Sequence, residues 1–180
     1  MRSVFVQIGK NGSCVLWVGI MSGKLSNRLR AIAGFIEEGT SVADIGTDHG
    51  YLPVHLALSG FAERIIASDI SVGSLSAARR SAEKYGVTEK IKFINAPGLD
   101  GVMEDEADTI VIAGVGGETM VSILSATPWV KNGKTLVLQP QSKLKDLLNY
   151  LAENGFRIMK TRLVQDKGKV YVVLKCVARA

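Results

Sequence analysis

Residues 41–53, SVADIGTDHGYLP, are the feature that most constrains the fold of this chain. A short apolar run over 42–45 contains one acid, Asp44, and is followed by a turn with two glycines and by a helix that we expect to begin after Pro53. In open α/β sheets, a strand, a glycine turn and a helix in this order form a ligand crevice at the carboxyl end of the first strand. Glycine allows the backbone to approach a ligand closely, and Asp44 can accept a hydrogen bond from that ligand.

The spacing within this turn indicates the kind of ligand. Gly46 and Gly50 lie four residues apart, with Asp48 and His49 between them. The dinucleotide fingerprint G-x-G-x-x-G has closer glycines, which bring a pyrophosphate onto a helix N-terminus. Because Asp48 would repel a pyrophosphate, a cationic ligand with an amine suits this turn better. S-adenosylmethionine, which carries a sulfonium, an ammonium and a ribose, is such a ligand.

A second acid follows the next predicted strand. Residues 65–70 are apolar except near their end, where Asp69 lies. An acid at the end of the second strand holds the ribose hydroxyls in nicotinamide and in S-adenosylmethionine sites alike. The other role open to Asp69 is to cap the helix that we expect over residues 71–85. A nicotinamide oxidoreductase therefore stays an alternative, supported by Asp69 and disfavoured by the acidic first turn.

The rest of the chain continues the alternation of strands and helices. We expect helices over 25–36, 54–58, 118–126 and 143–154, the last with four leucines facing inward, and strands over 91–94, 109–113 and 135–138. Residues 156–163 and 170–177 are two further strands, whose short connection over 165–168 predicts an antiparallel hairpin. This order predicts the α/β fold of a Rossmann-like class I methyltransferase, a doubly wound and mostly parallel sheet with a C-terminal antiparallel hairpin.

Length and composition limit the remaining possibilities. The 180 residues suffice for one domain. The only cysteines, Cys14 and Cys176, lie far apart without a C-x-x-C motif, which argues against a disulfide framework or a metal site and fits the cytoplasm. No apolar run reaches the ~20 residues of a membrane span. Residues 1–20 are either a β-hairpin with a turn at Asn11 and Gly12 or an extension before a natural start at Met21. We favour the extension, and residues 21–180 then form the methyltransferase domain.

Five segments together resemble one enzyme family. They are residues 24–29, 43–53, 112–117, 136–140 and 169–171, and in the order found here they resemble the bacterial tRNA (adenine-22-N1) methyltransferase family. The resemblance covers about residues 24–177. It implies S-adenosylmethionine as the methyl donor and N1 of an adenine in tRNA as the acceptor. The expected cofactor-binding residues are Asp44, Gly46, Asp69, Ile70, Asn95, Gly98 and Gly114.

Two departures from the family pattern favour an alternative function. Pro97 stands where the family usually has an acid in a Gly-Asp-Gly-Leu pattern. Family members also usually continue into a helical C-terminal domain that helps to hold tRNA, whereas this chain stops at Ala180, just after its last expected strand. These departures motivate the alternative of a non-catalytic tRNA-binding module that retains the methyltransferase fold.

The chemistry of methyl transfer indicates which other residues matter. Attack by N1 leaves the adenine positively charged, so a proton acceptor near its N6 amine would help. The candidates are Asp48, His49 and Tyr51, which lie in the turn that faces the crevice. His49 has a suitable intrinsic pKa, although it is equally suited to a structural hydrogen bond, and Tyr51 is suited either to stacking on a base or to packing. The backbone around residues 114–117 is expected to contact the donor or the base.

Contact with tRNA requires cations that neutralise phosphates. With a net charge of +5, the chain has candidates before the first strand and along the penultimate one. They are Lys24, Arg28, Arg30, Arg157, Lys160 and Arg162. A solvated helix face is the other interpretation of the first three. We expect tRNA as the partner, no membrane and no metal ion, with the oligomeric state left open and a monomer among the options.

Overall fold

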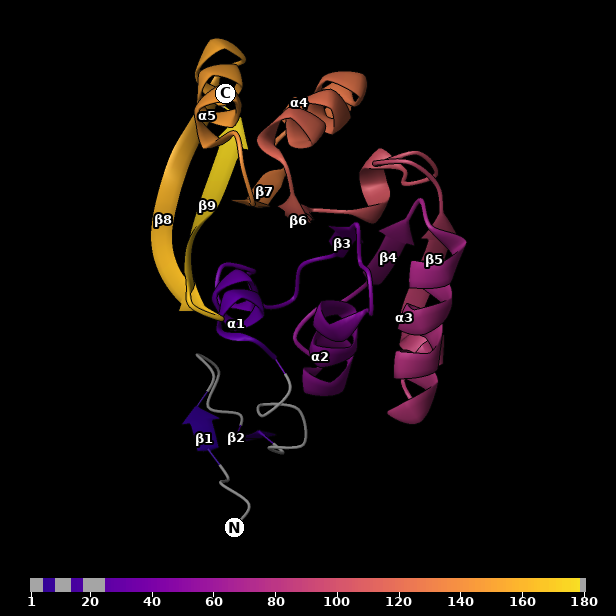
Figure 1. Cartoon of the computed structure of the whole chain (residues 1–180). Coiled ribbons are helices and arrows are strands. Elements are labelled where there is room, and N and C mark those ends of the chain that lie inside the picture. Colours follow the sequence, from indigo (N-terminus) through magenta and orange to yellow (C-terminus); the bar gives the residue numbers. More distant parts are fainter. Residues whose placement is uncertain (1–4, 9–13, 18–24, 179–180) are drawn as a thin grey trace.

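A computed structural model gives the structure of residues 5–8, 14–17 and 25–178 (Figure 1). The helices and strands, with short 3-10 helices labelled η, follow in chain order. They are β1 (Phe5–Ile8), β2 (Cys14–Trp17), α1 (Asn27–Ala33), β3 (Val42–Ile45), α2 (Tyr51–Ser59), β4 (Ile65–Asp69), α3 (Val72–Lys84), η1 (Thr88–Lys90), β5 (Ile91–Asn95), η2 (Glu104–Glu106), β6 (Thr109–Val115), α4 (Gly117–Ala126), η3 (Pro128–Lys131), β7 (Thr135–Pro140), α5 (Leu144–Glu153), β8 (Phe156–Asp166) and β9 (Lys169–Ala178).

Seven strands form one sheet in the order β5-β4-β3-β6-β7-β9-β8. The five strands from β3 to β7 are parallel, and β9 is antiparallel to both of its neighbours, β7 and β8. The chain winds outward from β3 in one direction and then from β6 in the other. Ligands bind at such a switch point, outside the carboxyl ends of the strands. The predicted doubly wound sheet with a C-terminal antiparallel hairpin is confirmed.

Helices cover the two faces of this sheet and create two apolar cores. Figure 1 shows α1, α2 and α3 on one side of the sheet and α4 and α5 on the other. Neighbouring residues of a strand face opposite sides, so Val42 packs with the first set of helices and Ala43 with the second. Burying an aliphatic side chain contributes roughly 1.5–3 kcal/mol. Because both faces are buried, the central strands are continuous apolar runs.

Three helices differ from the sequence prediction at their N-terminal ends. α2 begins at Tyr51 and not after Pro53, because a proline in the first turn of a helix lacks only an N–H that has no helical partner. α1 begins later than predicted, at Asn27, because the Ser26 side chain accepts a hydrogen bond from the Leu29 backbone N–H (3.3 Å) and caps the helix there; it also ends earlier than predicted, at Ala33. Leu144, predicted to face inward, is exposed at the first position of α5.

The β8–β9 hairpin reaches beyond the carboxyl end of its neighbour β7. Leu138 is the last β7 residue that pairs with β9, opposite Leu174, so the part of β9 before that residue extends past the sheet. Lys167 and Gly168 have φ values of 49° and 76°, which give the tight turn that joins antiparallel strands. The Asn27 side chain of α1 donates to the Gln165 carbonyl (3.1 Å). The predicted hairpin is confirmed, and it becomes a wall of the crevice described below.

The N-terminal strands form a separate antiparallel pair. β1 and β2 pair from Phe5 opposite Trp17 to Ile8 opposite Cys14. The predicted turn at Asn11 and Gly12 and the start at Met21 lie outside the described residues. Among the helices of the described part, none has the length and apolar character that crossing a bilayer requires.

Candidate active site

A cavity of about 1090 Å³ lies at the carboxyl ends of β3, β4 and β6, and we refer to it as the crevice. Its walls come from α1, the turn after β3, the loop after β5, the end of β6 and the β8–β9 turn. Ten of the residues predicted for the site line it together. They are Arg28, Asp44, Gly46, Asp48, His49, Tyr51, Asp69, Ile70, Gly98 and Gly114.

The turn after β3 is built from left-handed residues. Gly46, Asp48 and Gly50 have φ values of 74°, 52° and 67°, of which the value at Asp48 is unusual for a residue with a side chain. The backbone N–H groups of Gly46 and Thr47 both donate to the Ser68 carbonyl of β4, at 2.9 and 3.0 Å. The turn is therefore tied to the neighbouring strand, and it presents its backbone and side chains to the crevice.

Asp44 is a buried acid at the end of β3. Its Oδ2 accepts a hydrogen bond from the Thr47 hydroxyl at 2.8 Å. The pKa of Asp44 is raised to about 6, chiefly by burial and to a smaller extent by nearby Asp69, while the Thr47 hydrogen bond and the positive charge of Arg28 oppose the shift. A cationic ligand would stabilise the ionised carboxylate, so this site gains from binding one.

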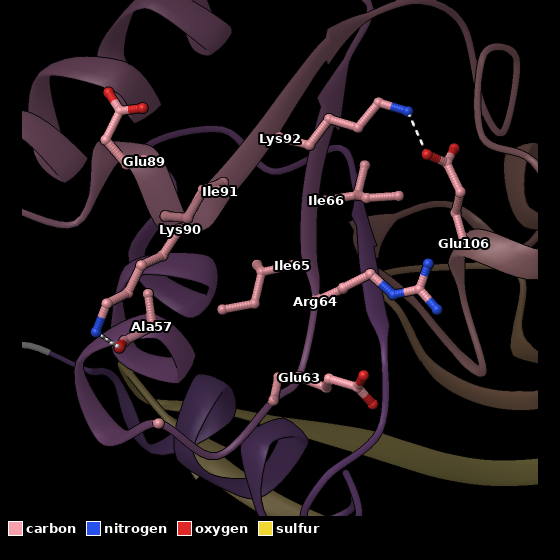
Figure 2. Close-up of a pocket in the computed structure, with 12 residues that line it drawn as sticks. Ala57, Glu63, Arg64, Ile65, Ile66, Glu89, Lys90, Ile91, Lys92 and Glu106 are labelled. Atoms are coloured by element: carbon pink, nitrogen blue, oxygen red, sulfur yellow. Dashed lines mark hydrogen bonds and ion pairs between the residues drawn. The ribbon is translucent and has the colours of Figure 1, made fainter.

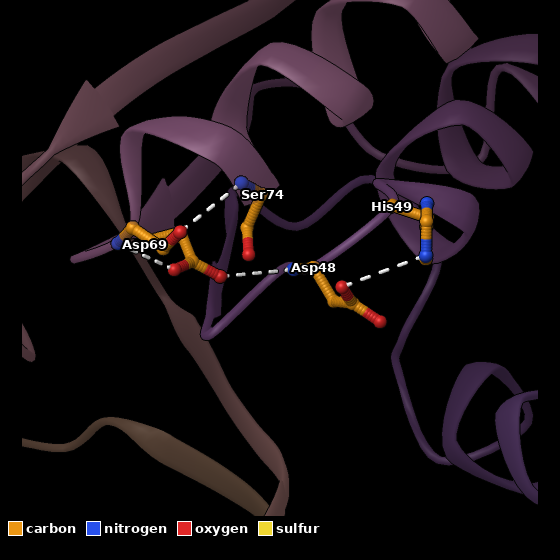
Figure 3. A network of polar contacts seen from close by, with 5 residues as sticks. Asp48, His49, Asp69 and Ser74 are labelled. Carbon is orange, nitrogen blue, oxygen red and sulfur yellow. Dashed lines mark hydrogen bonds and ion pairs between the residues drawn. The ribbon is translucent and has the colours of Figure 1, made fainter.

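Asp69 closes β4 and is held in place by backbone donors (Figure 3). Its two carboxylate oxygens accept from the Asp48 N–H at 3.0 Å and from the Ser71 N–H at 2.8 Å. Each oxygen retains a further lone pair for a ligand. The N-cap of α3 is Ser71, whose hydroxyl accepts from the Ser74 N–H at 3.2 Å. Asp69 is therefore not the helix cap, and it lines the crevice.

The residues after β4 and β5 form an apolar wall. Ile70 is 71% exposed at the crevice, and Pro97 and Gly98 line it beside Ile70. Asn95 is not among the lining residues; its side-chain amide donates to the carbonyls of Asp69 (2.8 Å) and Ile70 (3.1 Å). The structure therefore gives Asn95 a contact that fixes the end of β4.

His49 and Tyr51, two of the proposed catalytic residues, stack on one another. Their ring centroids lie 5.5 Å apart with an interplanar angle of 20°. The His49 Nε2 is 3.8 Å from the Asp48 Oδ1, and both side chains are more than half exposed (Figure 3). The three candidates thus form one group at the mouth of the crevice, where they can meet an incoming substrate.

The glycine-rich segment 114–117, at the end of β6, has two parts with different surroundings. Gly114 lines the crevice with a φ of 81°, and a Cβ there would lie 3.2 Å from the Arg28 Nη1. Gly117 faces away from it, because a Cβ there would lie 2.2 Å from the Lys143 carbonyl oxygen. The expectation that the segment faces the donor or the base thus applies to Gly114, whereas Gly117 allows α4 to pack on the loop before α5.

The predicted RNA-binding cations do not share one surface. Arg28 points into the crevice, where its Nη1 donates to the Gln139 Oε1 at 2.6 Å. The Arg30 Nε donates to the Leu25 carbonyl at 3.0 Å. Lys24 lies outside the described residues. Phosphate binding by Arg28 stays a prediction, and the structure adds a contact between its guanidinium and Gln139.

The three cations of β8 do share a face. Arg157, Lys160 and Arg162 lie opposite β9 residues 177, 175 and 173, which alternate and so point to one side of the sheet. The irregularity between Ile158 and Lys160 makes this possible, because a regular strand would place residues 157 and 160 on opposite faces. The Lys160 Nζ lies 5.0 Å from the Phe35 ring centroid, so this is the face that α1 covers.

Three residues of the site carried no predicted role. Thr47 holds Asp44, Gln139 holds Arg28, and Tyr171 lies under the Arg28 guanidinium, 5.8 Å from ring centroid to Cζ. Gln139 and Tyr171 belong to the Leu-Gln-Pro and Lys-Val-Tyr segments that carried the family resemblance. The family resemblance of these two segments is the sequence signal that points to Gln139 and Tyr171.

A second cavity, of about 570 Å³, lies at the opposite end of the sheet (Figure 2), and we refer to it as the amino-end cavity. It is lined by residues of β4, β5 and the end of α2, with both acids and bases among them. Lys92 and Glu106 form an ion pair there at 2.5 Å, and the Lys90 Nζ donates to the Ala57 carbonyl at 3.4 Å. Two of its charged side chains thus pair with one another, unlike the two acids of the crevice.

A Rossmann-like sheet with acids at the tips of two adjacent strands is the arrangement of a methyltransferase, and the methyltransferase domain model matches residues 25–174. The chain is 36% identical to the tRNA (adenine(22)-N(1))-methyltransferase of Bacillus subtilis over 152 residues, which are 84% of this chain and 64% of that relative. The structure of the B. subtilis tRNA methyltransferase TrmK is 34% identical with a TM-score of 0.82, covering 87% of this chain and 67% of the other.

A further similar structure is Streptococcus pneumoniae Sp1610 in complex with S-adenosyl-L-methionine. It is 34% identical with a TM-score of 0.81, covering 86% of this chain and 73% of the other. The chain therefore belongs to the methyltransferase-domain family, and its resemblance to bacterial tRNA (adenine-22-N1) methyltransferases is confirmed. The nicotinamide oxidoreductase and the non-catalytic tRNA-binding module are not favoured. The chain spans 64% of the length of the B. subtilis relative.

Proposed function

We propose that this chain binds S-adenosylmethionine in the crevice and transfers the methyl group to N1 of an adenine in tRNA, at position 22. One observation carries the proposal: Asp44 and Asp69 lie at adjacent strand tips, line the same crevice and keep lone pairs for a ligand. The Bacillus subtilis relative, by its name, acts on adenine 22 of tRNA, and the Streptococcus pneumoniae structure contains the methyl donor.

The two acids have separate tasks in this proposal. Asp69 accepts hydrogen bonds from the ribose hydroxyls, because it lines the crevice and backbone N–H groups hold its two oxygens in a fixed position. The buried carboxylate of Asp44 attracts the positively charged amino-acid part of the donor. Gly46 has no side chain and permits close approach, and Ile70 and Pro97 offer an apolar surface for the donor's adenine. The bound donor supplies an activated methyl group on its sulfonium.

The protein then has to align the acceptor with that methyl group. Adenine N1 lies on the Watson–Crick edge, so the base has to be unpaired at a cost of a few kcal/mol. Alignment of two reactants can contribute roughly 7–11 kcal/mol, which reduces the need for a strong catalytic base. Asp48, His49 and Tyr51 stand at the mouth of the crevice, and we assign them to contact the base and to accept a proton near its N6 amine.

The tRNA backbone is assigned to the cations of β8 and to Arg30, with Lys24 as a further candidate. Arg157, Lys160 and Arg162 lie on one face of β8, beside α1. Phosphate contacts release counterions, so affinity falls steeply as salt rises. A tRNA affinity that does not change between low and physiological salt would contradict this assignment. We also assign residues 21–180 to the methyltransferase domain and the protein to the cytoplasm.

The experiment is incubation of the full chain with tRNA and isotopically labelled S-adenosylmethionine, followed by nuclease digestion and mass spectrometry. We expect labelled 1-methyladenosine in the fragment that contains adenine 22. A tRNA whose adenine 22 is replaced by guanine is the matched control and should acquire no label. Labelling of another base, or no transfer by protein that binds the donor, would contradict the proposal.

A further inference from the structure

Arg28 of α1 and Tyr171 of β9 together form one wall of the crevice. The Arg28 Cζ lies 5.8 Å from the centroid of the Tyr171 ring, and both residues line the cavity. Tyr171 belongs to the part of β9 that extends past β7, and Arg28 lies in the first turn of α1. A cation and an aromatic ring are thus brought together from distant parts of the chain.

The Arg28 guanidinium is fixed by contacts that lie beneath this wall. Its Nη1 donates to the Gln139 Oε1 at 2.6 Å, and Gln139 is fully buried (0% exposed). The Gln139 Nε2 in turn donates to the Pro140 carbonyl at 2.8 Å, which orients the amide so that its oxygen faces Arg28. The absence of a side chain at Gly114 leaves room for the guanidinium, since a Cβ would lie 3.2 Å from Nη1. The arginine is therefore held in one place over the ring.

The charge of this wall differs from that of the two acids. Asp44 and Asp69 attract the sulfonium and the ammonium of the donor, whereas Arg28 contributes a positive charge, which also reaches Asp44 and opposes the rise of its pKa. Proteins bind unpaired bases by stacking them on aromatic rings and guanidinium planes. A tyrosine face also tolerates the positive charge that adenine acquires on N1 methylation. An aromatic ring with a fixed guanidinium therefore suits an unpaired acceptor base.

We propose that Tyr171 is the stacking surface for the methyl-accepting adenine, and that Arg28 and Gln139 act as positioning residues that hold its ring. The proposal rests on the proposed function, because it requires that the acceptor is an unpaired base in RNA. Lys167 lines the crevice in the adjacent turn, where its ammonium can meet the phosphate of the same nucleotide.

The test uses a tRNA transcript with 2-aminopurine in place of adenine 22, since the fluorescence of this base is quenched when it stacks on an aromatic ring. In the complex with the wild-type protein, the extruded 2-aminopurine should stack on Tyr171, which should quench its fluorescence. Tyr171→Ala should remove that quenching and weaken tRNA binding by about 10-fold or more, given the usual contribution of base–aromatic stacking. Tyr171→Phe, the matched control, should retain both properties within about twofold. Arg28→Lys should give an intermediate loss, because lysine keeps the charge but not the fixed plane.

Titration with S-adenosylmethionine separates this proposal from the proposed function. Both Tyr171 variants should bind the donor within about twofold of the wild-type affinity. A wild-type protein that neither binds nor methylates tRNA would overturn both proposals. A wild-type protein that methylates tRNA while Tyr171→Ala does so with unchanged tRNA affinity and quenching would overturn the stacking assignment alone. Loss of donor affinity in Tyr171→Ala would also overturn it, by placing Tyr171 in the donor site.

Discussion

The two ends of the sheet differ in how their charged side chains are paired. At the amino end, Lys92 pairs with Glu106 at 2.5 Å, so these two charges neutralise each other within the protein (Figure 2). At the carboxyl end, Asp44 and Asp69 form no salt bridge with a lysine or arginine of the described chain, and their partners are a hydroxyl and backbone N–H groups. This difference indicates where a ligand binds. A charged side chain that is paired within the protein contributes to the fold, whereas a carboxylate that is fixed by hydrogen bonds but has no cationic partner is available to a ligand.

The two glycines at the ends of α2 differ in how tightly they are packed. Gly50 precedes the helix at the crevice and Gly60 follows it at the amino-end cavity, with nearly equal φ values of 67° and 65°. A Cβ at Gly50 would lie 2.8 Å from the Ala78 Cβ, whereas a Cβ at Gly60 would have no atom within 4 Å. The turn at the crevice is packed against α3, and the other end is open.

The largest expected effect comes from replacing these two glycines. Gly50→Ala should lower the free energy of unfolding by about 4 kcal/mol, because a left-handed alanine costs roughly 1–2 kcal/mol and overpacking against Ala78 adds roughly 1–3 kcal/mol. Gly60→Ala should cost only about 1 kcal/mol, since the backbone strain stands alone there. Urea unfolding of both variants measures the difference. Equal losses would show that the crevice turn is not more tightly packed than the opposite end.

The second prediction concerns the stability of the protein without a ligand. Folding raises the pKa of Asp44 to about 6, so ionisation of this acid opposes folding. The stability contributed by the protonated form is present at low pH and is lost as pH rises from about 4 to about 6. Asp44→Asn should therefore stabilise the protein by about 3 kcal/mol at pH 8, the equivalent of about two pKa units.

The pH dependence is the control for this gain. At pH 4 the folded Asp44 is neutral and the unfolded one is only about half ionised, so most of the advantage of Asp44→Asn should have disappeared there. Denaturant melts of the two proteins at pH 4 and pH 8 test this directly. An asparagine variant that is less stable at pH 8 would mean that Asp44 contributes to the fold and is not a group reserved for a ligand.

The third prediction is the reverse effect of the same substitution on donor binding. Asp44→Asn should weaken S-adenosylmethionine binding at pH 8 by roughly 30-fold, because one interaction with a charged group contributes about 1.5–3 kcal/mol. The wild-type affinity should also fall as pH drops below about 6, where Asp44 becomes protonated. Calorimetric titration at pH 5 and pH 8 measures both. An affinity independent of pH and of the substitution would exclude Asp44 from the donor site.

The smallest effect is expected at the amino-end cavity. Glu106→Gln removes the ion pair with Lys92, whose partners are partly exposed, and should cost at most about 1 kcal/mol of stability. Donor affinity should stay within about twofold of the wild type. A loss of donor affinity here as large as that of Asp44→Asn would remove the distinction between the two ends.

The sequence was sufficient for features that depend on neighbouring residues. The apolar run over 42–45, the glycine turn after it and the acid at the end of the next strand specified β3, β4 and the crevice, because a strand's tip and its turn are contiguous in the chain. The resemblance supplied the donor and the acceptor. The sequence predicts that α2 begins after Pro53, whereas the helix begins at Tyr51, because a first helical turn accepts proline.

Features that depend on packing between distant segments were beyond sequence reasoning. Arg28 was assigned to phosphate binding, but the docking of α1 against the extended hairpin turns it toward Gln139 and Tyr171. The irregularity after Ile158, which places the cations of β8 on one face, has no sequence signal in a single chain. The contact of Arg28 with Gln139 joins residues more than a hundred positions apart.

A crystal structure of the full chain with S-adenosylmethionine would show where the donor binds. We expect the donor in the crevice, with its ribose hydroxyls within hydrogen-bond distance of the Asp69 carboxylate and its amino-acid part beside Asp44. A donor bound at the amino-end cavity, or a crevice that stays empty at saturating donor concentration while both acids remain in place, would contradict this expectation.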